Sequence, residues 1–404
     1  MPDSIIAAFG SVPKDGGTFT FYRNIRPALL EHGIDMRCVA IGKAQAELWE
    51  EAYVDDGCVL LAPDTRNIKK QAIVFAEWCD KEKVDIVMGI NSEAILSSLP
   101  HLPEKIKAMS RCANAFDHGY KITLSCAERL ARIVAITPRL KSDLIEKYGA
   151  DPSKLSLIPN GIDQAPFEQA AKAKRGQELS LQLGFLGRLE HNQKGVLYLP
   201  EIVQELNRLG VQFKLRIAGK GKHQTQLELN LKTEIEKKQV ELVGALTPDS
   251  VPAFLSETDL FLFTSHFEGC PNALLEAIMA GCVPVSWLID GITDFIIEDD
   301  KSGFICPMED VKFFARRIKE LDKDREKLQA MSEATAQVGR ARFTHECAAM
   351  AYASLFKEVM VELPPLWVPK PWKEFRQDPN FEHSWTELLP ANIKNWLKQF
   401  TAAM

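Results

Sequence analysis

Short apolar runs alternate with helical stretches along most of the chain, and no other feature restricts the fold as strongly. Such alternation builds mostly parallel sheets covered on both faces, with ligand sites at the carboxyl ends of the strands. The sequence therefore predicts an α/β fold. Strands are expected at residues 4–9, 35–41, 59–62, 85–90, 113–116, 133–137 and 154–158, and then at 179–186, 213–218, 240–244 and 260–264. Long helices are expected at 18–32, 311–338 and 348–361.

The length of 404 residues exceeds what one hydrophobic core usually organises, so two domains are expected. The 46% of apolar residues suffices to fill both cores. The polar stretch 165–178 shows no strand pattern and is interpreted as the inter-domain linker. It separates a first domain at 1–164 from a second domain at 179–345.

Composition and charge exclude several classes of protein. A net charge of −6 and a pI near 5.9 argue against nucleic acid as the main partner. The nine cysteines are scattered and contain no Cys-x-x-Cys, which indicates reduced thiols in a cytoplasmic protein. The N-terminus lacks the basic region of a signal peptide, and no apolar run is long enough to cross a bilayer. Peripheral attachment to the inner face of a membrane stays open.

The stretch from Phe263 to Val285 reads as a strand end, a loop, a short helix and a new strand. Pro271 suits the first helical turn, and Gly281 suits the left-handed position after the helix end. Free backbone N–H groups around 269–273, together with the helix dipole, offer a site for a phosphate.

Two carboxylates flank this anion site. Glu268 lies in the loop, and Glu276 falls one turn after Asn272 and shares its helix face. One acid can face a group being transferred and the other the hydroxyls of its carrier. A strand, a Gly/Pro loop and a helix also occur in α/β proteins without such a site, so the spacing alone leaves function open.

The run Glu268-Gly-Cys-Pro-Asn-Ala-Leu-Leu-Glu276 resembles the signature of the retaining glycosyltransferases of family 4, which use nucleotide sugars. Gly187-Arg-Leu with Lys194-Gly resembles that family's diphosphate-binding pair, and Gly219-Lys-Gly resembles its Gly-x-Gly turn. The turn at 158–163, Ile-Pro-Asn-Gly-Ile-Asp, matches the family's end of the first domain.

The resemblance implies the GT-B architecture. Two Rossmann-like, doubly wound domains face a deep cleft, and a C-terminal segment, here 346–404, crosses back to complete the first domain. The resemblance makes 1–164 the acceptor domain and 179–345 the domain that binds the nucleotide-sugar donor. Four of the seven tryptophans lie in this segment, at 367, 372, 385 and 396. A membrane or partner contact of these rings is the alternative to packing on the first domain.

The resemblance also implies roles for particular residues. Glu268 and His118 would serve catalysis by holding the donor sugar, with Gly269 beside it, and Glu276 would accept the ribose hydroxyls. Backbone at Val243 and Gly244 would contact the nucleobase. The diphosphate would be bound by Arg188, Lys194, Gly16, Gly17, Cys270, Pro271 and Asn272.

Four points remain open at this level. His118 also fits a plain structural role. Arg139 resembles a residue that lies near the acceptor or phosphate in the family, but a surface arginine at a helix start explains it equally well. Whether Glu268 acts as a nucleophile is undecided. Asp290 and Asp294 stand where Gly and Glu are commoner in the family, which leaves the local pocket shape undefined.

The chain is therefore expected to be a retaining enzyme that moves a hexose-type sugar from a nucleotide-diphosphate sugar to a hydroxyl of a glycan, glycolipid or polysaccharide precursor. Neither a cofactor nor a metal is expected, because cationic side chains and a helix dipole can stabilise the departing diphosphate. The alternatives are a non-catalytic partner subunit, or a sugar phosphorylase or epimerase on the same fold. Oligomeric state is not readable from the sequence.

Overall fold

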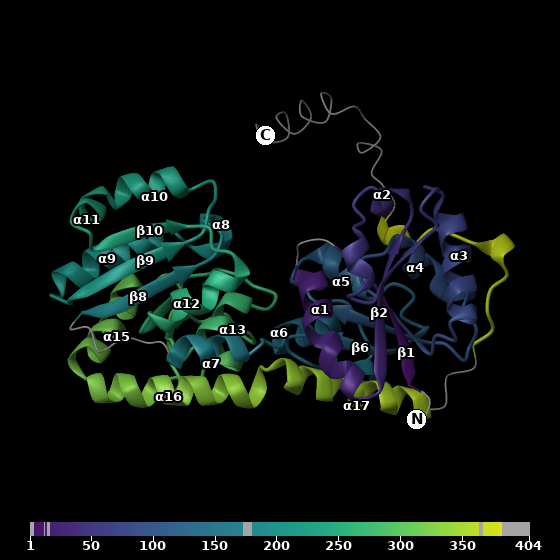
Figure 1. Ribbon diagram of the computed structural model, residues 1–404. Coiled ribbons are helices and arrows are strands. Elements are labelled where there is room, and N and C mark those ends of the chain that lie inside the picture. The colour runs from purple at the N-terminus through teal and green to yellow at the C-terminus, as the bar shows by residue number, and fades with distance from the viewer. Residues whose placement is uncertain (1–3, 12, 14–16, 173–179, 363–366, 382–404) are drawn as a thin grey trace.

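The computed structural model describes residues 4–11, 13, 17–172, 180–362 and 367–381. They form two α/β domains side by side, joined along one edge by the long helices α16 (Arg325–Arg342) and α17 (His345–Val361) (Figure 1). Each domain contains one sheet, and every strand pairing in the two sheets is parallel. The predicted pair of doubly wound domains is confirmed.

The sheet of the first domain has seven strands in the order β3-β2-β1-β4-β5-β6-β7. The order reverses between β1 and β4, and in open α/β sheets ligands bind beyond the carboxyl ends of the strands at such a reversal. The strands are β1 (Ile5–Gly10), β2 (Ile34–Ile41), β3 (Cys58–Leu61), β4 (Ile86–Gly89), β5 (Lys107–Cys112), β6 (Leu130–Ala135) and β7 (Leu155–Leu157).

Successive side chains of these buried strands point to opposite helix layers. In β1, Ala8 packs with the layer of α3 and α4, whereas Ala7 and Phe9 pack with α1 and α17. Two buried faces explain why the strands are apolar throughout rather than alternating. The helices of this domain are α1 (Gly17–Glu31), α2 (Lys43–Ala46), α3 (Ile68–Lys81), α4 (Glu93–Ser98), α5 (Asp117–Thr123) and α6 (Pro138–Glu146).

The second sheet has six strands in the order β10-β9-β8-β11-β12-β13, with its reversal between β8 and β11. Its strands are β8 (Leu181–Leu186), β9 (Phe213–Ala218), β10 (Val240–Gly244), β11 (Leu260–Phe263), β12 (Val283–Trp287) and β13 (Phe304–Cys306). Its other helices are α8 (His191–Lys194), α9 (Tyr198–Arg208), α10 (Gln224–Asn230), α11 (Lys232–Glu236), α12 (Val251–Ser256), α13 (Asn272–Met279), α14 (Thr293–Ile296) and α15 (Val311–Lys323).

The stretch interpreted as a linker, 165–178, starts with helix α7 (Ala165–Lys172). Phe167 of this helix is buried in the core of the second domain among residues of α12 and α13. Residues 173–178 lie outside the described part of the chain.

The chain crosses between the domains twice, near Ile162 and near Thr344, and the two crossing segments lie against each other. Ile162 donates its backbone N–H to Phe343 at 2.8 Å, and His345 donates to Ile162 at 3.1 Å. A Cβ on Gly161 would lie 2.4 Å from the carbonyl oxygen of Thr344, so a larger residue there would push the crossings apart. The two connections between the domains are therefore held together by backbone hydrogen bonds.

Two predicted elements are wrong. Residues 113–116 form a loop, and the neighbouring strand is β5, which ends at Cys112. That strand is hidden in the sequence by the charged Arg111, which is buried here and donates to the Tyr352 hydroxyl at 3.1 Å. The expected helix 311–338 is broken between α15 and α16, because the Asp324 side chain caps α16 by accepting from the backbone N–H of Lys327 at 2.8 Å.

Residues 367–381 run along the outside of the first domain. The ring of Trp372 stacks on His101 with centroids 4.5 Å apart, and Arg129 lies over Trp367. Trp385 and Trp396 lie outside the described residues. In the described part of the chain, no helix combines the length and apolar character that crossing a membrane would require.

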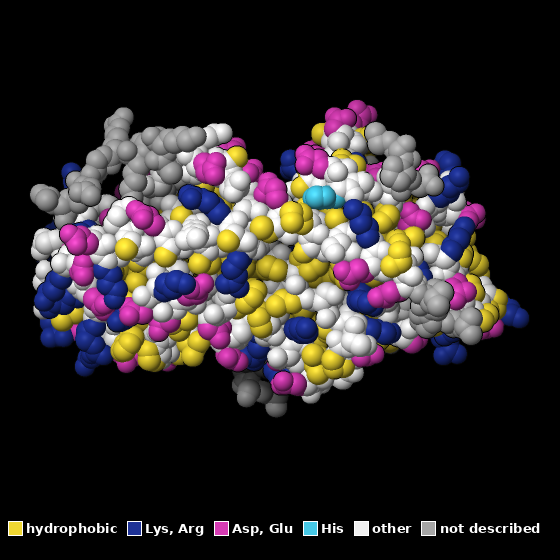
Figure 2. Space-filling model, turned by 90° about the horizontal axis from the view of Figure 1, so that it is seen from below, with side chains coloured by type: hydrophobic (Ala, Val, Ile, Leu, Met, Phe, Trp, Pro, Cys, Tyr) yellow, Lys and Arg dark blue, Asp and Glu magenta, His cyan; other side chains and the backbone are white. Residues whose placement is uncertain are grey.

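The face that carries α16 and α17 shows two lobes with an indentation between them at one edge (Figure 2). Positive and negative side chains are interspersed over this face, and neither sign forms a continuous patch.

Replacing Phe356 of α17 with alanine should lower the free energy of unfolding of the first domain by about 3–5 kcal/mol, because the fully buried ring fills the core under α1. Urea denaturation followed by far-UV circular dichroism measures this change. Met350→Ala, on the exposed side of the same helix, is the matched control and should change stability by less than about 0.5 kcal/mol. Equal effects of the two substitutions would show that α17 is not part of the core.

Candidate active site

A buried ion pair lies at the reversal point of the second sheet. The Lys194 ammonium, at the end of α8, lies 2.6 Å from a carboxylate oxygen of Glu268, in the loop after β11. The side chains are 15% and 6% exposed, so both charges are largely removed from water. Each charge stabilises the other, because burying either one without its partner would cost a large desolvation free energy.

The short helix α8 is placed by the backbone around Gly195. Gly195 has φ +61°, and a Cβ there would lie 2.0 Å from the carbonyl oxygen of Thr264. The Thr264 hydroxyl also donates to the Lys194 carbonyl at 2.9 Å. The glycine thus lets the loop after β8 touch the end of β11, and this contact brings Lys194 to Glu268.

Gln193 links Arg188 to the ion pair, and the sequence analysis missed it. Its amide oxygen accepts from the Arg188 guanidinium at 2.6 Å, and its amide nitrogen lies 3.5 Å from Glu268. Arg188 is exposed, so its remaining donors face solvent. Only its place in the sequence could have indicated this role, because Gln193 directly precedes Lys194 in the loop that carries both predicted cations.

His266, two residues before Glu268, also contacts α8. Its backbone N–H donates to Gln193 at 2.8 Å, its ring nitrogen Nδ1 lies 3.1 Å from the Asn192 carbonyl, and its ring stacks on Trp287. The ring therefore packs inside the domain and supports the cationic loop.

The amino end of α13 presents unused donors. Among the described residues, the backbone N–H groups of Gly269, Cys270 and Ala273 have no hydrogen-bond partner. Pro271 is the residue that precedes the helix, and Gly281 closes it with φ +77° as the sequence predicts. Burial raises the pKa of the Cys270 thiol to about 12, so this thiol stays neutral beside the donors.

A chain of hydrogen bonds ties this helix start to the first domain. The Asn272 side chain accepts from Asn160 at 2.9 Å, and Asn160 accepts from Arg111 at 2.6 Å. The backbone at Gly269 also lies against Ala113, since a Cβ there would be 2.7 Å from the Ala113 carbonyl oxygen. The anion-binding end of α13 is therefore positioned by both domains.

Glu276 stands apart from these networks. Within the described part of the chain its carboxylate forms no hydrogen bond or ion pair, and burial alone raises its pKa to about 7. A carboxylate without a protein partner is free to accept hydroxyl donors from a ligand.

The strand ends of the second domain are joined by backbone hydrogen bonds. Gly187 donates to Ala218 at 3.0 Å, and Gly219 donates to Gly244 at 2.7 Å. Val243 is 36% exposed at the end of β10, and Gly244 has φ +83°. These hydrogen bonds place the backbone of 243–244 at the same edge of the sheet as the loop that carries Arg188.

The remaining predicted residues lie in the first domain. His118 is exposed in the first turn of α5, and its ring meets Phe381 edge to face at 6.2 Å. Gly17 is exposed as the first residue of α1, and Gly16 lies outside the described residues. Arg139 pairs with Asp143 one helical turn away, a contact that fits its structural interpretation.

The structure thus brings Arg188, Lys194 and Glu268 together and lays the amino end of α13 against the first domain. Among the described residues, the hydrogen-bond partners of Glu268 are Lys194 and Gln193, and His118 is not one of them. Two cations, unused backbone donors and a helix dipole at one edge can hold a diphosphate, while a carboxylate without a protein partner can accept hydroxyls.

Family models match both halves of the chain. Glycosyltransferase Family 4 matches residues 15–165, and Glycosyl transferases group 1 matches residues 167–338. The putative colanic acid biosynthesis glycosyltransferase WcaL of Escherichia coli (strain K12) is 32% identical over 193 residues, 45% of this chain and 46% of that protein. The chain spans about half the length of the first two curated relatives it matches, 46% and 54%.

A longer match is the UDP-Gal:alpha-D-GlcNAc-diphosphoundecaprenol alpha-1,3-galactosyltransferase of Escherichia coli, 27% identical over 302 residues, 68% of this chain and 77% of that protein. Among solved structures, a glycosyltransferase from Rickettsia africae has a TM-score of 0.73 at 14% identity, covering 89% of this chain and all of that one. Anabaena Alr3699/HepE in complex with UDP has a TM-score of 0.70 at 14% identity, covering 88% of this chain and all of that one. With both domains matched by family models and the fold shared with these structures, the chain belongs to glycosyltransferase family 4, with the GT-B fold.

Proposed function

We propose that this protein is a retaining, metal-independent hexosyltransferase. It would take a hexose from a UDP-sugar and transfer it to a hydroxyl of a polysaccharide or glycolipid precursor in the cytoplasm, with no cofactor. The observation that carries the proposal is the buried Lys194–Glu268 pair, with Arg188 held beside it by Gln193. Support for UDP and for a lipid-linked acceptor comes from the name of the galactosyltransferase relative.

In this proposal the diphosphate lies between Arg188, Lys194 and the amino end of α13. Charge develops on the phosphate oxygens as the bond to the sugar breaks, and prearranged donors stabilise that charge best. Two of the three donors of the Lys194 ammonium remain for the ligand after its contact with Glu268. Glu268 would then lie beside the sugar as well as beside the lysine.

His118 would complete the sugar site when the donor binds. The segment before it already touches the Glu268 loop, because Gly269 lies against Ala113 and Asn114. Val243 and Gly244 would meet the base through their backbone.

The test is to incubate the purified protein with UDP-, GDP- and ADP-sugars in the presence of EDTA. Thermal stabilisation and slow release of nucleoside diphosphate are followed, since a ligand of the folded state raises its apparent stability. A shift and release with a UDP-hexose are expected, and NMR of the product should show the anomeric configuration of the donor. Activity that needs added Mg²⁺, or an inverted product, would refute the corresponding part of the proposal.

Arg188→Ala and Lys194→Ala should each weaken UDP binding by about tenfold to hundredfold, the size of a lost charge-assisted hydrogen bond. Isothermal titration calorimetry measures the change. Arg340→Ala, an exposed arginine on α16, is the matched control and should leave UDP affinity unchanged. UDP affinities equal to wild type in both site variants would remove these residues from the diphosphate site.

Binding of UDP should release a proton from Glu276 near pH 6. Burial raises the pKa of the free carboxyl to about 7, so most of it is protonated there, and donation from ribose hydroxyls lowers the pKa by favouring the ionised form. Calorimetry in two buffers of different ionisation enthalpy counts the protons.

Glu276→Gln should lose this release and bind UDP about tenfold more weakly. Glu333→Gln, an exposed glutamate on α16, should behave as wild type. Comparing variants also cancels the ionisation of UDP itself. Identical proton release in Glu276→Gln and wild type would contradict the ribose assignment.

A further inference from the structure

Three histidine rings from different loops of the second domain lie around helix α8. His191 is the first residue of α8, His223 directly precedes α10, and His266 lies in the loop after β11. The ring centroid of His191 lies 6.1 Å from that of His223 and 5.6 Å from that of His266. The cluster is therefore next to the two predicted cations of the donor site, because Lys194 is the last residue of α8.

Two of the three rings accept hydrogen bonds from backbone that holds α8 in place. The backbone N–H of His191, at the start of the helix, has no partner within the helix and donates to Nδ1 of His223 at 3.0 Å. The backbone N–H of Leu197, beyond the end of the helix, donates to Nδ1 of His191 at 3.3 Å. Each Nδ1 must therefore present a lone pair, which leaves the proton of each neutral ring on Nε2.

His266 has the opposite arrangement. Its Nδ1 faces the carbonyl oxygen of Asn192 at 3.1 Å, so this nitrogen carries the proton and donates. Its Nε2 lies 3.5 Å from a carboxylate oxygen of Glu309. A second proton on His266 would keep the bond to Asn192 and add an attraction to Glu309, so protonation of this ring is compatible with the structure.

Protonation of His191 or His223 would instead remove the hydrogen bonds that hold α8. A protonated ring carries a hydrogen on both nitrogens, so its Nδ1–H would point at a backbone N–H. The helix ends at Lys194, and Gln193 of the same helix holds the Arg188 guanidinium at 2.6 Å. The positions of both cations therefore depend on neutral rings at 191 and 223.

The charged groups around the cluster already have partners. Glu309, from the loop after β13, is exposed and lies closest to His266. Glu190 lies near His223 but forms an ion pair with Lys222. Neither carboxylate replaces the hydrogen bonds that a protonated His223 would lose.

Burial, followed by the charges of His266 and His223, holds the pKa of His191 below its ordinary value, and Glu309 opposes this shift only in part. Tyr198 of α9 lies against the His191 ring with centroids 5.0 Å apart, and burial raises the pKa of its hydroxyl to about 12, so it stays neutral. The folded protein thus favours neutral His191. The stabilisation from this ring is complete above the ordinary pKa of about 6.5 and is lost as the pH falls below it.

We propose that His191 and His223 are positioning residues for the donor site: their neutral rings hold α8, and binding of a nucleoside diphosphate weakens when either ring takes up a proton. The inference rests on the proposed diphosphate site at Arg188 and Lys194. The diphosphate would also attract a positively charged ring, and this attraction alone would strengthen binding at low pH. The direction of the pH dependence therefore tests the proposal.

The first test locates the ring protons in the full chain without a ligand. The histidines are labelled with ¹⁵N, and long-range ¹H–¹⁵N NMR at about pH 8, where histidine is neutral, shows which ring nitrogen carries the proton. Each signal is assigned from the matching histidine-to-asparagine variant. We expect the proton on Nε2 in His191 and His223 and on Nδ1 in His266. A proton on Nδ1 of His191 or His223 would overturn the proposal.

The second test measures UDP affinity by isothermal titration calorimetry at about pH 8 and about pH 5.5, on either side of the ordinary histidine pKa. His223→Asn keeps an acceptor oxygen near the position of Nδ1 but cannot take up a proton, so it should bind UDP as wild type does at the higher pH. On going to the lower pH, wild type should lose about threefold to tenfold more affinity than this variant, the size of a lost hydrogen bond. His191→Asn should respond in the same way, whereas His223→Leu should bind about tenfold more weakly already at the higher pH.

His32→Asn is the matched control, because His32 is exposed in the first domain, and it should follow wild type at both pH values. Ionisation of UDP and of Glu276 is common to all these proteins and cancels in the comparison. If UDP binds and His223→Asn loses as much affinity as wild type, or loses more, the positioning role fails while the donor site stands. If UDP does not bind wild type at the higher pH, the proposed function itself fails, and the NMR measurement still decides the positions of the ring protons.

Discussion

The Lys194–Glu268 ion pair is the interaction on which the geometry of the second domain's site depends. Its two residues come from loops that leave the sheet on opposite sides of its reversal point, after β8 and after β11. Bringing the loops together buries both charges, and neither can remain buried without the other. The contact at Gly195, the support from His266 and the link through Gln193 all hold this one pairing in place.

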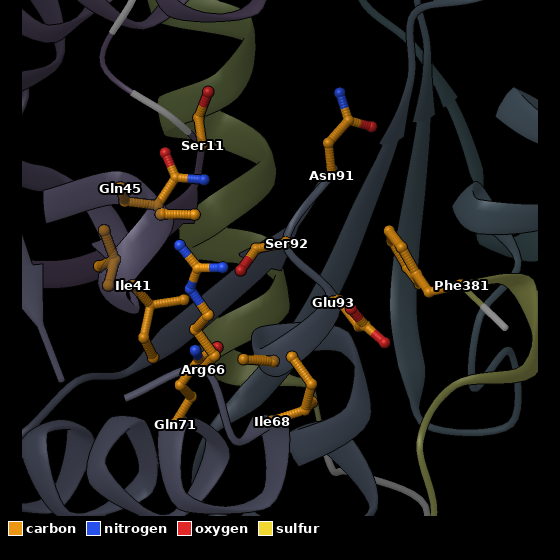
Figure 3. A pocket seen from close by; sticks show the side chains of 13 residues that line it. Ser11, Ile41, Gln45, Arg66, Ile68, Gln71, Asn91, Ser92, Glu93 and Phe381 are labelled. Atoms are coloured by element: carbon orange, nitrogen blue, oxygen red, sulfur yellow. The ribbon is translucent and has the colours of Figure 1, made fainter. Parts of the chain in front are cut away.

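The same principle of organisation appears in the first domain, with different chemistry. There the reversal point of the sheet opens into a cavity lined by polar, charged and apolar side chains, with Phe381 of the C-terminal segment at one wall (Figure 3). Each sheet thus carries one candidate binding site where its strand order reverses. Hydrogen bonds through Arg111, Asn160 and Asn272 connect the two domains between these sites.

The fold was predictable because buried parallel strands leave long apolar runs, and β9 and β10 have the predicted bounds. The strand ending at Cys112 was missed because Arg111 is buried with partners distant in sequence, which no local pattern shows. In the site, charged residues and glycines were visible as motifs. Gln193 was not, since an amide in a polar loop has meaning only once the fold places it between Arg188 and Glu268. The position of Phe381 likewise depends on contacts between the C-terminal segment and residues of the first domain that are far away in the sequence.

The return of α17 to the first domain has a consequence for synthesis of the protein. Phe9, Met36 and Met88 belong to the face of the first sheet that α17 covers, yet residues 345–361 are made only after the whole second domain. During translation this apolar face therefore stays partly exposed to solvent while the second domain is synthesised. The first domain to be made is therefore the last to be finished, and a nascent chain halted before α17 leaves exposed an apolar surface of the kind that promotes aggregation.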